Sequence, residues 1–136
     1  MKVIRIILPL LLIGLFSCGE DTSPRDQDCP KELLCTEEFV SLTFSPRENG
    51  MVIQFDSYYT QNLDNGETYN YDPNDNLPDD LSYVVISDAE MGEIAKDGTS
   101  IRFFGIKDNQ VLIEQDFIVG HDCCHVIPLD GPFGGL

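Results

Sequence analysis

The amino-acid sequence predicts an all-β fold, an antiparallel β-sandwich of about seven strands. Short segments of alternating or β-branched apolar residues recur along the chain. Turn dipeptides such as Asn49-Gly50 separate them, and only residues 89–96 have a pattern that suits a helical turn. Short strands at spacings of about 10 to 15 residues, joined by tight turns, are typical of sandwiches.

The first residues have the pattern of an export signal. Lys2 and Arg5 supply positive charge, and residues 6–16 form an uncharged, mostly apolar run of 11 residues. A membrane-spanning helix needs about 20 apolar residues, so this run is too short to be an anchor. We therefore expect residues 1–17 to be a cleaved signal peptide.

A cysteine follows this signal. Residues 15–18, Leu-Phe-Ser-Cys, resemble the lipobox of bacterial lipoproteins, with leucine three positions before the cysteine and a small residue just before it. The resemblance implies that signal peptidase II cuts before Cys18 and that Cys18 carries acyl chains such as palmitate. These chains would anchor the protein in a membrane. The alternative is ordinary secretion, with Cys18 incidental.

Residues 18–28 are expected to form a flexible acidic tether. Residues 19–28 contain no side chain that could bury apolar surface to offset the entropy of ordering. Glu20 and Asp21 resemble the acidic export signal of surface lipoproteins in Bacteroidetes-type bacteria. That resemblance implies an outer-membrane lipoprotein of the cell envelope that is exposed at the surface; a plain solvated linker is the alternative.

The charge balance excludes one class of partner. The chain has 8 Lys and Arg against 24 Asp and Glu, and a formal net charge of −16. Removing Lys2 and Arg5 with the signal leaves 6 − 24 = −18. Nucleic acid is bound through Lys and Arg, so we expect no nucleic-acid partner. The acidic surface favours solubility and cationic partners.

Four cysteines remain once Cys18 is set aside: Cys29, Cys35, Cys123 and Cys124. An even number in an exported chain predicts disulfides, and four cysteines allow three pairings. A bond between adjacent cysteines needs strained geometry, so we expect at least one bond between the two ends of the domain. Closing a loop of roughly 90 residues should stabilise the fold by about 4 kcal/mol. The pairing itself stays open.

The expected strands of the domain, residues 29–136, are 38–45, 51–60, 67–71, 81–87, 100–106, 111–120 and 121–129. The first two are expected to form a hairpin around Asn49-Gly50. One face of the second is expected to carry Ile53, Phe55, Ser57 and Tyr59. One face of strand 111–120 is expected to carry Val111, Ile113, Phe117 and Val119, with Glu114 and Asp116 opposite. Residues 89–96 suit a helical turn or a short strand.

These segments together resemble a family. The matching pieces are Cys35-Thr36 with Phe39, residues 56–60, Tyr83-Val84-Val85, Ser87-Asp88, Phe104-Gly105, and residues 122–126 with Gly131. The chain resembles small Bacteroidetes-type lipoproteins of uncharacterised activity that are related to carboxypeptidase regulatory-like, or transthyretin-like, β-sandwich domains. The resemblance covers most of residues 35–131, and residues 122–126 are its most specific part. It implies a prealbumin- or immunoglobulin-like sandwich at the envelope and no catalytic residues.

Two metal sites are weighed against simpler interpretations. His121, Cys123, Cys124 and His125 carry zinc or copper ligands, but they crowd into five residues and the thiols compete with disulfide formation. The loop with Asp72, Asn74, Asn76, Asp79 and Asp80 has the spaced oxygens of a calcium loop. Leu77 stands where such a loop has glycine, so a solvated acidic loop is favoured. We expect no cofactor.

Other chemistries have weaker support. A thiol enzyme needs a free, activated cysteine, and the sequence has neither a Cys-x-x-Cys motif nor a Gly-x-Ser-x-Gly elbow. The tyrosines Tyr58, Tyr59, Tyr69, Tyr71 and Tyr83 suit strand packing before they suit a binding surface. We expect no enzymatic activity, with thiol-redox chemistry as the outlying alternative.

The sequence thus predicts a lipid-anchored cell-envelope β-sandwich with a non-catalytic binding or structural role. Its partners would be the membrane, through the acyl chains, and an envelope protein. The alternative is a surface protein that binds calcium or a transition metal.

Overall fold

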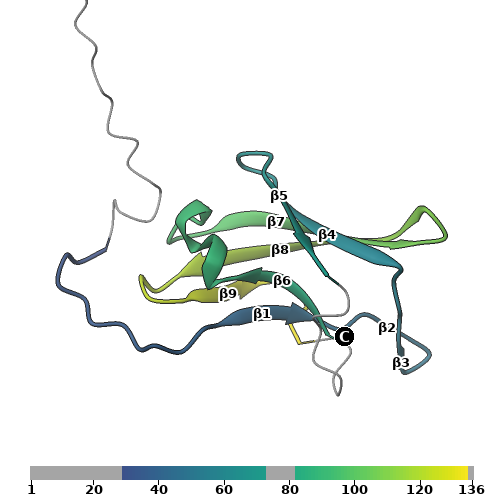
Figure 1. Cartoon of the computed structure of the whole chain (residues 1–136), viewed down its shortest axis with the longest axis horizontal. Helices are drawn as coiled ribbons and strands as arrows, with labels where there is room; N and C mark the ends of the chain where they lie inside the picture. Colours follow the sequence, from purple (N-terminus) through teal and green to yellow (C-terminus); the bar gives the residue numbers. More distant parts are fainter. Residues whose placement is uncertain (1–28, 73–81, 135–136) are drawn as a thin grey trace, which may run out of the picture.

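The largest unit of the fold is an antiparallel sheet of five strands in the order β5-β4-β7-β8-β9 (Figure 1). Its strands are β4 (Ser57–Asn62), β5 (Thr68–Tyr71), β7 (Thr99–Lys107), β8 (Gln110–His121) and β9 (Val126–Asp130). This computed structural model describes residues 29–72 and 82–134. The prediction of an all-β, antiparallel fold is confirmed.

A second, two-stranded sheet pairs β1 (Ser41–Phe44) with β6 (Tyr83–Ser87). Phe44 of β1 packs edge-on against Phe103 and Phe117 of the large sheet, with ring centroids 5.4 Å and 5.3 Å away. The small sheet therefore covers one face of the large one. After β6 the chain forms a 3₁₀ helix, η3 (Asp88–Glu93), which confirms a helical turn in this region.

The core lies between the two sheets and is dominated by aromatic rings. Phe103 of β7 is at its centre, and four rings surround it at centroid distances below 6 Å: Phe44, Phe55, Tyr58 and Tyr83. Such aromatic pairs add about 0.5–1.5 kcal/mol each beyond the burial of area. Aliphatic side chains complete this core: Val85, Ile86, Ile94, Ile101, Val119 and Val126.

The predicted hairpin between residues 38–45 and 51–60 is wrong. β1 pairs with β6, whose residues lie 39 to 46 positions further along the chain, and the Asn49-Gly50 turn closes only a two-residue ladder. That ladder joins β2 (Arg47–Glu48) to β3 (Met51–Val52). Asn49 and Gly50 both have positive φ, as a tight hairpin turn requires. The turn was therefore predicted correctly, but the strands that it joins were not.

The predicted strand 51–60 is interrupted, and its side chains do not all share the predicted face. The chain leaves the ladder at residues 53–56, where the Phe55 N–H donates to the Tyr83 hydroxyl (3.1 Å) and that hydroxyl donates to the Ile53 carbonyl (3.0 Å). β4 then begins with the opposite alternation. It buries Tyr58, Thr60 and Asn62, and Ser57 and Tyr59 lie on the other face. One irregular segment is enough to exchange the two faces of a strand.

The β7–β8 hairpin matches its prediction more closely. Asp108 and Asn109 form its turn with φ of 53° and 58°, the signature of a type I′ turn. Phe117 and Val119 of β8 are buried as expected, whereas Val111 is half exposed because it lies beyond the rim of the core. The predicted final strand or strand edge 121–129 is confirmed from Val126 on, as β9, but is wrong for residues 122–125, which form a turn between β8 and β9.

Several predictions fall outside the described residues. They are the signal peptide 1–17, Cys18 with the tether 18–28, and the loop oxygens of Asn74, Asn76, Asp79 and Asp80. Within the described ranges, no helix has the length and apolar character needed to cross a membrane.

Candidate functional site

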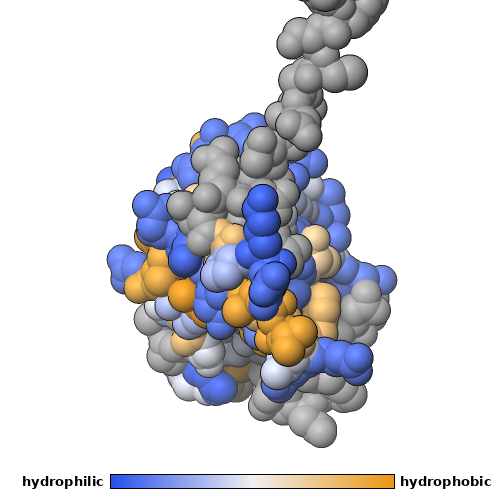
Figure 2. All heavy atoms as spheres, turned by 90° about the vertical axis from the view of Figure 1, so that its left-hand side faces the viewer, coloured by the Kyte–Doolittle hydropathy of each residue, from blue (hydrophilic) through white to orange (hydrophobic). Residues whose placement is uncertain are grey.

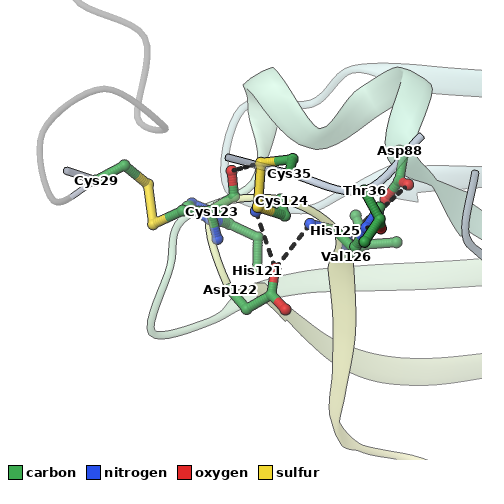
Figure 3. The surroundings of a disulfide bond; sticks show 10 residues. All are labelled: Cys29, Cys35, Thr36, Asp88, His121, Asp122, Cys123, Cys124, His125 and Val126. Atoms are coloured by element: carbon green, nitrogen blue, oxygen red, sulfur yellow. Dashed lines mark hydrogen bonds and ion pairs between the residues drawn. A yellow bond between two sulfur atoms is a disulfide. The ribbon is translucent and has the colours of Figure 1, made fainter. Parts of the chain in front are cut away.

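The turn between β8 and β9 holds both adjacent cysteines (Figure 3). Its backbone closes through the Asp122 N–H and the His125 carbonyl at 3.0 Å. One Asp122 carboxylate oxygen accepts the N–H groups of Cys124 (2.9 Å) and His125 (2.8 Å). Cys123 adopts φ of +78°, a left-handed conformation that is rare for residues other than glycine. The turn therefore breaks the alternation that a continuous strand would impose on the two cysteines.

Each of these cysteines is joined to a different N-terminal cysteine. Cys29 is bonded to Cys123 and Cys35 to Cys124, with Cα separations of 5.6 Å and 5.3 Å. The bonds span 94 and 89 residues of sequence. The expectation of at least one bond between the two ends is confirmed, and both bonds are of this kind. We call residues 29–35 and 121–126, with these two bonds, the clamp.

His121 lies under the clamp and is buried. Its Nδ1 accepts the Cys123 N–H at 3.0 Å. A ring nitrogen of His121 and the sulfurs of Cys29 and Cys123 lie within 4.8 Å of one another. In the disulfide those sulfurs carry no thiolate charge, which is the form that binds zinc or copper. Reduction of this bond would be needed before the three groups could act as metal ligands.

The remaining metal candidates are placed differently. Cys124 is in the second disulfide, and both ring nitrogens of His125 are occupied by Thr36 and Asp88. The structure thus brings the four predicted zinc or copper ligands into one turn, but the two cysteines are in disulfides and both histidines are engaged in hydrogen bonds. Of the predicted calcium ligands, only Asp72 lies within the described residues.

Three polar side chains, Thr36, His125 and Asp88, form a hydrogen-bonded chain that includes one residue of the clamp. The Thr36 hydroxyl is 2.9 Å from His125 Nε2, and His125 Nδ1 is 2.8 Å from an Asp88 oxygen. The Asp88 carboxylate also accepts the backbone N–H groups of Val40 and Val126, each at 2.8 Å. Asp88 therefore ties together η3, the segment before β1, and the start of β9.

The hydrogen bonds among Thr36, His125 and Asp88 indicate which of their atoms carry protons. Burial alone would raise the pKa of Asp88, but hydrogen bonds from His125 and from the Val40 and Val126 N–H groups outweigh it and lower that pKa below its usual value. Asp88 is thus a carboxylate at neutral pH and accepts from Nδ1–H of His125. In the neutral ring, Nε2 is then left to accept the hydrogen of the Thr36 hydroxyl.

The hydrogen-bonded set of Thr36, His125 and Asp88 was not predicted from the sequence. Thr36 and Asp88 entered only as parts of short matching pieces, and 89 and 37 residues separate them from His125. The local signal that could have pointed to Asp88 is its neighbour Ser87, which caps η3 and forms a capping box with Glu90.

The tyrosines divide between the core and the outer face. Tyr58 and Tyr83 are buried among the central rings, which supports the packing role. Tyr59 instead stacks on Phe104 at a centroid distance of 4.7 Å. Burial and nearby acidic side chains raise the pKa of Tyr71 far above its usual value, so its hydroxyl stays protonated.

Comparisons with protein families, curated proteins and solved structures gave no match to this chain. The resemblance to transthyretin-like lipoproteins accordingly remains a prediction.

Proposed function

We propose that this protein is a lipid-anchored module of the cell envelope with a binding or structural role. The observation that carries the proposal is the clamp, because it bonds Cys29 and Cys35, at the start of the described domain, to the β8–β9 turn. A chain that hangs from an acylated Cys18 would pass any pull on its tether directly into the five-stranded sheet. The domain would stay folded even if the contacts of residues 36–40 opened.

Two further properties support this role. Disulfides persist in oxidising compartments outside the cytosol, where a lipoprotein domain resides. The strongly acidic composition keeps such a domain soluble beside the membrane and favours a basic surface on an envelope partner. The finer assignments that belong to this proposal are a transthyretin-like sandwich of about seven strands and a place on the outer membrane. The covering of the large sheet by β1 and β6 supports the first.

The test is to express the full chain in a bacterial host fed with labelled palmitate. We expect label in the protein and recovery of the protein with membranes. The control variant Cys18→Ser should lose the label and appear in the soluble fraction, because Cys18 is the acceptor. Label that is unchanged by Cys18→Ser would refute the anchor. Protease treatment of whole cells then reports which side of the outer membrane the domain occupies.

A second candidate function is favoured by the Thr36–His125–Asp88 chain. A hydroxyl that donates to an imidazole held by a carboxylate is the arrangement of acyl-transfer enzymes. His125 would take the Thr36 proton as the hydroxyl oxygen attacks an ester carbonyl, and would return it to the departing alcohol. Water would then release the acid from Thr36. The measurement is hydrolysis of an aryl ester by the wild type, Thr36→Ser and Thr36→Val. Activity in the first two that is lost in Thr36→Val would establish the enzyme, and equal rates in all three would exclude it.

A further inference from the structure

The segment that begins the described domain exposes three large apolar side chains. Leu34 is 96% exposed, Phe39 65% and Leu33 44%. All three lie within ten residues of Cys29, where the tether predicted by the sequence ends. Contiguous exposed apolar side chains mark a surface for a partner or a membrane, and these three fall within one stretch of seven residues, 33–39.

The backbone that carries the two leucines is held in place. Cys29 and Cys35 flank Leu33 and Leu34, and each is bonded to the β8–β9 turn. The leucines are therefore presented on a fixed support, so less conformational entropy is lost when they bind. This segment runs along the left side of Figure 1. Figure 2 looks onto that side of the molecule, and hydrophobic atoms gather there among hydrophilic ones.

We propose that Leu33, Leu34 and Phe39 insert into the headgroup region of the bilayer that holds Cys18. This inference rests on the proposed lipid anchor. It assigns the apolar side chains a role that the anchor alone does not, which is to fix the orientation of the domain on the membrane. The clamp end would face the lipid, and the β7–β8 turn would point away from it.

The length of the tether supports the bilayer as the occupant. From Cys18 to Cys29 the chain has 11 steps. Fully extended it reaches at most about 40 Å, and a flexible chain of that length has a root-mean-square span of about 20 Å. A short tether of this kind gives an effective concentration in the millimolar range, so even a weak patch is occupied.

Charge selects the kind of lipid. Around the apolar side chains stand Glu32, Glu37 and Glu38, all exposed, with Lys31 as the one exposed basic residue among residues 29–40. Anionic headgroups repel such a surface, whereas zwitterionic ones do not. We therefore expect insertion into phosphatidylcholine and weaker insertion as an anionic lipid is added.

The experiment uses the chain's lack of tryptophan. Leu34→Trp places a single fluorophore at the proposed point of insertion. Leu112→Trp is the matched control, because Leu112 is also an exposed leucine (53%) but lies nine residues before His121 along β8, about 30 Å from the clamp end. Cys18 is the one cysteine of the five outside the two disulfides. The mature chain from Cys18 can therefore be coupled to a maleimide lipid in vesicles.

We expect the emission of Leu34→Trp to move to shorter wavelength on coupling and to be quenched by brominated phosphatidylcholine. Leu112→Trp should change in neither respect, and Phe39→Ser in the Leu34→Trp chain should reduce the quenching. Equal behaviour of the two tryptophans on fully coupled vesicles would overturn the proposal. A wavelength shift of Leu34→Trp that grows with protein concentration without vesicles would also overturn it, because the occupant would then be a second copy of the chain.

This experiment tests the insertion of the apolar side chains independently of the acylation of Cys18. Coupling through maleimide places the chain on the bilayer whether or not cells acylate Cys18. Absence of palmitate label in cells would refute the proposed function, while the fluorescence result refutes or supports the insertion of the apolar side chains on its own terms.

Discussion

The two disulfides of the clamp end on adjacent residues, and this makes their contributions to stability strongly non-additive. Either bond alone closes a loop of about 90 residues, since the separations are 94 and 89. In the chain-entropy model such a loop stabilises the folded state by about 4.6 kcal/mol. Once one bond is present, the other closes only a small ring made of residues 29–35 and 123–124, which is 7 + 2 = 9 residues. That ring contributes about 2.6 kcal/mol.

The perturbation is to remove the bonds singly and together. We expect Cys29→Ala with Cys123→Ala, and Cys35→Ala with Cys124→Ala, to lower the free energy of unfolding by about 2.6 kcal/mol each. Removing all four cysteines should lower it by about 7 kcal/mol, about 2 kcal/mol more than the sum of the two pairs. A loss of that size approaches the whole stability of a small domain.

The assay is urea unfolding followed by far-ultraviolet circular dichroism. Packing losses at the alanines, including that at the buried Cys123, occur in both arms of the cycle and cancel from the difference. The reasoning is refuted if each pair costs as much as all four cysteines, or if the two pairs simply add.

Three smaller perturbations test the surroundings of the clamp and the core. Hydrogen bonds from the His125 and Cys124 N–H groups lower the pKa of Asp122 in the folded protein. The carboxylate therefore contributes fully to folding stability above the unfolded pKa of about 3.9. That contribution is lost as pH falls through the lower folded pKa. Asp122→Asn should therefore flatten the loss of stability below about pH 4, measured as urea midpoints against pH. Thr36→Val should cost about 0.5–1.5 kcal/mol in the same assay and Thr36→Ser almost nothing, because only the first removes the hydroxyl. Gly105→Ala should cost about 1–3 kcal/mol in thermal melting, since a Cβ there would clash with the Phe55 ring; an unchanged midpoint would contradict this packing.

Strands were predicted well where the sequence marks both the turn and the buried face. For the β7–β8 hairpin, Asp108-Asn109 fixed the turn, and the alternation of Phe117 and Val119 fixed the buried face. It failed for β1, because alternation reports which side of a strand is buried but not which strand lies beside it. The partner of β1 is β6, and this pairing places Phe44 over Phe103 of the large sheet.

The face of β4 was lost to a local irregularity. Four residues of non-strand backbone around Phe55 exchange the two faces, and nothing in a pattern of alternating residues marks where a ladder is interrupted. The bonds of the Tyr83 hydroxyl to this backbone are long-range, so they became visible only in the fold.

The clamp was predicted in kind but not in pairing. Four cysteines in an exported chain indicate disulfides, and the position of two of them at each end favours bonds between the ends. The pairing depends on the left-handed conformation of Cys123 and on the two N–H groups that Asp122 accepts. Asp122 favours turns, but a left-handed cysteine at position 123 has no such preference, so the sequence alone did not specify this turn.

The most direct test of a clamped and anchored domain is a non-reducing tryptic digest of the protein purified from the envelope. Trypsin cuts after Arg25, Lys31, Arg47 and Lys107, so Cys29, Cys35 and the adjacent pair fall in three peptides, 26–31, 32–47 and 108–136. We predict one species with the summed mass of all three, together with a peptide 18–25 that carries acyl chains. Peptide 26–31 joined to 32–47 alone, with 108–136 separate, would contradict the clamp, and an unmodified peptide 18–25 would contradict the anchor.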